Sequence, residues 1–112
     1  MKEEILAFIS SRIDWHKREH IRLKKAFCQD QAAHEQICIN VYNIFLATYQ
    51  AMQYDVGKTM IKFSGIISTW DANHRKAYEH HNEEAMFIEQ LKLDRALEII
   101  QRVKEMERCL HD

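Results

Sequence analysis

Apolar residues recur every three or four positions along most of this chain. One run of this kind comprises Leu6, Ile9, Ile13, His16, His20, Leu23 and Phe27. A second comprises Val56, Met60, Phe63, Ile67, Trp70, His74, Ala77 and His81. This spacing places the apolar side chains on one face of an α-helix, where they can pack against other helices. The pattern therefore predicts a helical protein in which each helix buries one stripe of side chains.

Two breaks in the apolar pattern are marked by residues that commonly cap helices. The first lies at residues 28–30, where Asp30 is a suitable N-cap for the helix that follows. The second lies at residues 54–57. There, Asp55 can cap the next helix, or Gly57 can end the previous one.

A third break is expected at Asn82, because asparagine suits both the end and the start of a helix. An alternative break at residues 71–73 would shorten the third helix and lengthen the fourth. With the break at Asn82, helices are expected over about 2–27, 31–53, 56–81 and 83–110.

The composition supports a few long helices. The chain has 112 residues, no proline and only two glycines, whereas a β-fold with many turns needs more of both. Short connections make consecutive helices antiparallel neighbours. We therefore predict a single all-α domain over residues 1–112, an antiparallel up-down-up-down four-helix bundle with short loops and no sheet.

Charge and cysteine content exclude several classes of function. The net charge is −1, so no overall attraction to nucleic acid or an anionic membrane is expected. No stretch approaches the roughly 18 apolar residues of a membrane span, and the charged N-terminus does not fit a signal peptide. The three cysteines form no Cys-x-x-Cys pair, which is typical of a reduced protein. A cytoplasmic protein is expected.

Histidines on the apolar stripes are the strongest chemical signal, because buried imidazoles need hydrogen-bond partners or a metal ion. With a rise of 1.5 Å per residue, His20, His34 and His74 are predicted at similar depth in the bundle. His16 lies one turn from His20, and Cys38 lies one turn from His34. These residue types would bind one ion of zinc, iron or copper. The alternative is that the histidines are hydrogen-bonded within the core or lie at its edge.

Several large apolar residues lie off the main stripes and compete for a narrow core. They are Phe8, Ile21, Tyr42, Tyr49 and Phe87. Surplus apolar residues on long helices commonly form a self-complementary contact between two copies. A homodimer, or a complex with another protein through the same patch, is therefore expected.

A short segment resembles a motif of the HEPN ribonucleases, which are also small helical bundles. Arg75 and His80 have the Arg-x4-His spacing of that family, but Lys76 follows the arginine where the family often has a shorter polar residue. The resemblance covers six residues and implies metal-independent RNA cleavage across a dimer. A solvated helix face explains the same residues more simply.

No complete catalytic set is present, so a non-enzymatic role is favoured. The sequence supports a small protein-protein interaction or regulatory module that forms a dimer. A metal-binding helical sensor or carrier without any other cofactor is the second interpretation, and a HEPN-like ribonuclease is the third.

Overall fold

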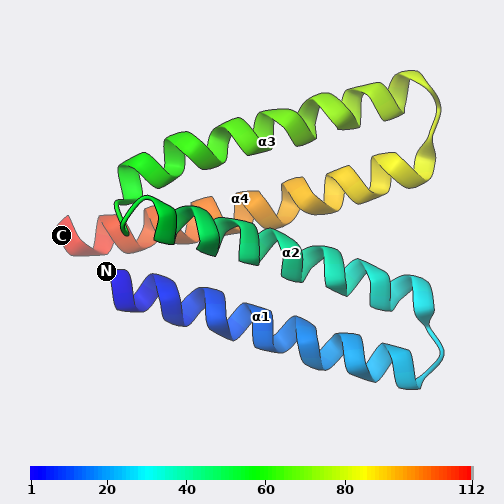
Figure 1. Cartoon of the computed structure of the whole chain (residues 1–112), viewed down its shortest axis with the longest axis horizontal. Helices are drawn as coiled ribbons and strands as arrows, with labels where there is room; N and C mark the ends of the chain where they lie inside the picture. The colour runs from blue at the N-terminus through cyan, green and yellow to red at the C-terminus, as the bar shows by residue number, and fades with distance from the viewer. Residues whose placement is uncertain (112) are drawn as a thin grey trace.

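The computed structural model describes residues 1–111, which form four α-helices joined by short loops. The helices are α1 (Lys2–Lys25), α2 (Gln29–Ala51), α3 (Val56–Glu79) and α4 (Glu83–His111). No strand occurs within this described part of the chain. Consecutive helices run in opposite directions, as Figure 1 shows. The predicted all-α up-down fold is therefore confirmed.

The helix starts agree with two of the three predicted caps. The Asp55 carboxylate accepts a hydrogen bond from the Lys58 backbone N–H at 2.9 Å, and Gly57 lies inside α3 rather than ending α2. The Asn82 side chain accepts a hydrogen bond from the Ala85 N–H at 3.1 Å.

The predicted N-cap at Asp30 is wrong. Helix α2 begins at Gln29, two residues before the predicted start at residue 31, and its N-cap is Cys28. Asp30 instead lies in the first turn, where its negative charge still favours the positive end of the helix dipole. The alternative break at residues 71–73 is also excluded, since α3 continues without interruption to Glu79.

The first three helices end in the same way, and none of them uses a glycine. Each is followed by a residue in the left-handed conformation, namely Phe27 (φ 61°), Gln53 (φ 55°) and His81 (φ 55°). In each case the next N–H donates to a carbonyl five residues back: Cys28 to Leu23, Tyr54 to Tyr49 and Asn82 to Ala77, at 2.8–2.9 Å. These are Schellman motifs, in which glycine is the favoured residue.

Replacing Phe27 by glycine should therefore raise the free energy of unfolding by up to about 1 kcal/mol, because glycine adopts positive φ without a steric penalty. Little packing would be lost, since Phe27 is 87% exposed. Urea denaturation followed by circular dichroism measures the change. Ala33→Gly, at an exposed position inside α2, is the matched control and should lower stability by about 1 kcal/mol. If Phe27→Gly lowered stability as Ala33→Gly does, the steric penalty attributed to the positive φ of Phe27 would be contradicted.

The helices pack as two antiparallel hairpins that meet through α2 and α4. Helix α1 packs mainly on α2, and α3 mainly on α4, whereas α1 and α4 contact each other little and α1 does not pack on α3. Figure 1 shows the two hairpins converging near the chain termini and diverging towards the loops at 26–28 and 80–82. The hairpins therefore lie closest together near the termini.

The main hydrophobic core lies where the hairpins converge. Its most deeply buried members are Ile5, Ile9, Val41, Tyr42, Phe45, Tyr49, Phe63, Ala96, Ile99 and Val103. Leu23, Ala32 and Ala77 are also buried, but they lie outside this cluster, towards the diverging ends. Among the helices described, none has the length and apolar character needed to cross a membrane.

Candidate functional site

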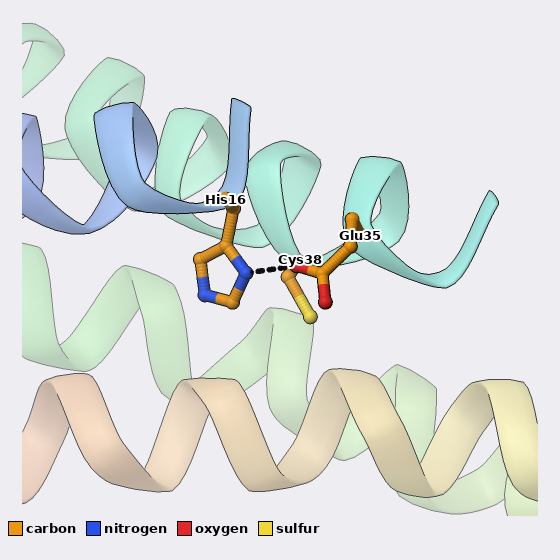
Figure 2. Close-up of side chains that lie close together, drawn as sticks. All are labelled: His16, Glu35 and Cys38. Atoms are coloured by element: carbon orange, nitrogen blue, oxygen red, sulfur yellow. Dashed lines mark hydrogen bonds and ion pairs between the residues drawn. The ribbon is translucent and has the colours of Figure 1, made fainter. Parts of the chain in front are cut away.

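Three side chains with different metal-binding atoms meet between α1 and α2. His16 comes from α1, and Glu35 and Cys38 lie one turn apart on α2 (Figure 2). One potential ligand atom from each residue lies within 4.8 Å of the other two. Within residues 1–110 this is the only such group of three or more histidine, cysteine or acidic side chains.

His16 is held firmly but is not fully hydrogen-bonded. Its side chain lies in the protein interior, with the residue 3% exposed, and its Nδ1 donates to the Glu35 carboxylate. The ring also meets Trp15 edge-on, with centroids 4.9 Å apart, and lies 5.5 Å from the Tyr42 ring. The second ring nitrogen, Nε2, is buried and has no hydrogen-bond partner.

Cys38 is buried and remains a free thiol. Burial raises the pKa of this thiol to about 11, because the thiolate would lose its hydration. At neutral pH the sulfur is therefore protonated, which argues against a role as a nucleophile.

A second polar network lies beside this cluster and connects α1, α2 and α4. The Tyr42 hydroxyl donates to Glu98 at 3.0 Å, and Arg12 and Arg95 both form ion pairs with Glu98 at 3.1 Å. Desolvation is the main cause of the raised pKa of Tyr42, and the hydrogen bond to Tyr42 is the main cause of the raised pKa of Arg12. Sequence reasoning missed this network, because Arg12 and Glu98 lie beside the apolar stripes rather than on them.

The four histidines predicted as a metal site do not converge. His20 donates from Nδ1 to the Ala32 carbonyl oxygen at 2.8 Å, and the His34 ring packs on Phe87 with centroids 4.7 Å apart. His74 belongs to α3, which does not pack on α1. His34 belongs to the same hairpin as His20 but faces Phe87 of α4, so a similar depth along the helices does not bring these histidines to one shared face. Of the predicted ligands, His16 and Cys38 lie together in the group with Glu35.

The residues predicted to form an apolar surface are divided between core and surface. Tyr42 and Tyr49 are buried, so they are removed from the predicted patch. Ile21 and Phe87 are each 54% exposed, and Phe8 is half-buried. Other exposed large apolar residues are Trp15, Phe27, Tyr54, Ile61, Tyr78, Leu97 and Leu110.

A groove runs between α1 and α4, where these helices contact each other little. One cavity of about 380 Å³ is lined by Phe8 of α1 and by Leu97, Glu98 and Arg102 of α4, among others. A second, of about 540 Å³, lies nearer the termini and shares Arg102 with the first. Beside the groove, one exposed stripe follows α4 at alternating spacings of three and four: Asp94, Leu97, Gln101, Lys104 and Arg108.

The two residues of the HEPN-like segment lie at an exposed helix end. Arg75 forms an ion pair with Asp71 at 2.9 Å, and His80 is the C-cap of α3. Comparisons of the chain with protein-family models, with curated proteins and with solved structures found no match.

Proposed function

We propose that this protein is a small helical interaction module that forms a homodimer through α4. The observation that supports this function is the exposed stripe on the second half of that helix, which we call the α4 stripe: Asp94, Leu97, Gln101, Lys104 and Arg108. Its spacing places all five side chains on one face, and Leu97 is 56% exposed.

The order of charges along the α4 stripe favours a second copy as the partner. An acidic residue stands at one end and two basic residues at the other. In an antiparallel pair centred near Gln101, Asp94 of each copy would face Arg108 of the other, whereas a parallel pair would place Arg108 against Arg108. A contact with two-fold symmetry therefore has complementary charges.

The apolar groove beside the stripe enlarges the available surface. Residues 94–108 cover about 21 Å of helix, which alone is short for a stable interface. Phe8 and Leu97 line the adjoining groove, and Ile100 is half-buried on the same side of α4. Together they offer the apolar centre and charged rim that are typical of interfaces.

The cysteines agree with a reducing location for this module. Cys28, Cys38 and Cys109 are all free thiols, a form that the cytoplasm maintains. We place the dimer in that compartment.

Leu97→Asp should weaken the dimer at least about tenfold, because it replaces the exposed apolar side chain of the stripe, one turn from Gln101, by a charge within the contact. Analytical ultracentrifugation of the wild-type protein and the variant measures the dissociation constant. Ile61→Asp, at an exposed position on α3, is the matched control and should leave dimerisation unchanged.

The opposite charges at the two ends of the α4 stripe allow a second test of the same contact. Asp94→Arg and Arg108→Asp should each weaken the dimer, and the double variant should regain affinity because the opposite charges again face each other. A wild-type protein that stays monomeric at high micromolar concentration would contradict the proposed function.

A further inference from the structure

The unpartnered nitrogen of His16 is unusual for a buried polar atom. Nearly all such atoms in native proteins have a partner, and exceptions mark bound ions, bound water or chemical function. Figure 2 shows Nδ1 of this ring directed at Glu35 and Cys38, with Nε2 on the far side. A neutral imidazole carries one proton, so a metal ion bound at Nδ1 would leave that proton on Nε2. Binding at Nδ1 would replace the hydrogen bond to Glu35 by bonds from both side chains to the ion, while Nε2 stays without a partner.

The three side chains supply a sulfur, a nitrogen and an oxygen atom. Zinc accepts all three, whereas magnesium and calcium prefer oxygen alone. Ligand atoms around tetrahedral zinc lie roughly 3.3–3.8 Å apart, given bond lengths of 2.0–2.3 Å. The potential ligand atoms of His16, Glu35 and Cys38 all lie within 4.8 Å of one another. They would have to move by roughly an ångström to reach this geometry.

The charged residues around these three side chains are compatible with a bound divalent cation. Arg12 and Arg95 are close enough to influence Cys38, but both are paired with Glu98. A zinc ion bound by the Glu35 carboxylate and a Cys38 thiolate would carry no net charge, which suits a buried position. The thiol proton would leave to solvent as the ion binds.

We propose that His16, Glu35 and Cys38 bind one Zn²⁺ ion per chain, with a fourth coordination position left for water. This site is separate from the α4 stripe and does not depend on dimerisation. It also differs from the predicted set of histidines, because His20, His34 and His74 take no part in it.

Cobalt and zinc titrations of the Cys28→Ser/Cys109→Ser variant test the site, because Cys38 is then the only thiol in the chain. We expect one Co²⁺ per chain with a thiolate-to-cobalt charge-transfer band, displacement of cobalt by zinc, and a higher melting temperature with zinc than with chelator. Absence of the band in protein of full helical content would overturn the proposal.

Variants in the same background identify the ligands. Cys38→Ser should remove the band and weaken zinc binding by about 100-fold or more, and Glu35→Gln should weaken it at least about tenfold. His20→Ala is the matched control and should retain binding. Zinc affinity that survives Cys38→Ser, or that is lost in a folded His20→Ala variant, would refute this set of ligands. If a ligand substitution impairs folding, the cobalt titration of the Cys28→Ser/Cys109→Ser variant still tests whether the site binds metal.

Discussion

Replacing Ile9 by aspartate should leave the protein largely unfolded at room temperature. Ile9 is completely buried in the main core. A carboxylate there would have no partner, and burying an unpaired charge costs several kcal/mol. Small domains are stable by only about 5–15 kcal/mol in total. We expect a loss of at least about 4 kcal/mol, measured by urea denaturation followed by circular dichroism.

The matched control is Ile21→Asp on the same helix. Ile21 is 54% exposed, so the new carboxylate stays in contact with water and stability should fall by less than about 1 kcal/mol. Similar losses at the two positions would show that the buried face of α1 is assigned incorrectly.

Phe45→Ala should lower the free energy of unfolding by about 3–5 kcal/mol, the usual cost of removing a large buried aromatic side chain. The Phe45 ring lies edge-on to Phe63 of α3 with centroids 5.2 Å apart, and it stacks on Tyr49 at 6.0 Å. Its removal would leave a cavity between α2 and α3 that these neighbours cannot fill by small movements.

Phe27→Ala provides the comparison for this substitution. Phe27 is exposed and contributes little to the core, so the same change should cost less than about 0.5 kcal/mol. Thermal and urea denaturation of both variants measure the difference. A loss below about 1 kcal/mol for Phe45→Ala would contradict the packing of α2 on α3.

The helices could be predicted from sequence because their signals are local. The three-four spacing depends on the geometry of a single helix, and Asp55 and Asn82 cap the helices that follow them. The width of each buried face depends on tertiary packing. Helix α2 packs against both α1 and α4, so Tyr42 and Tyr49 are buried although they lie off the predicted stripe.

The candidate site could be predicted only in part, and the reason again lies in tertiary packing. The sequence indicates His16 and Cys38 as possible ligands, but the structure groups them with Glu35 rather than with His20, His34 and His74. The rise per residue gives the depth of a residue along its helix but not the side of the helix that it occupies: His20 binds Ala32 of α2, whereas His34 packs on Phe87 of α4. Glu35 follows His34 directly in sequence, yet it is Glu35 that faces His16.

The divergence of the hairpins makes stability uneven along the chain. Beyond the main core, the hairpins still touch where the His34 ring packs on Phe87, but buried residues such as Leu23, Ala32 and Ala77 lie outside the main cluster. These ends can open by local unfolding while the core remains closed, and amide hydrogens near the loops at 26–28 and 80–82 then exchange with solvent first. Because each hairpin joins segments that are close in sequence, it can also form early in folding, before the two halves meet.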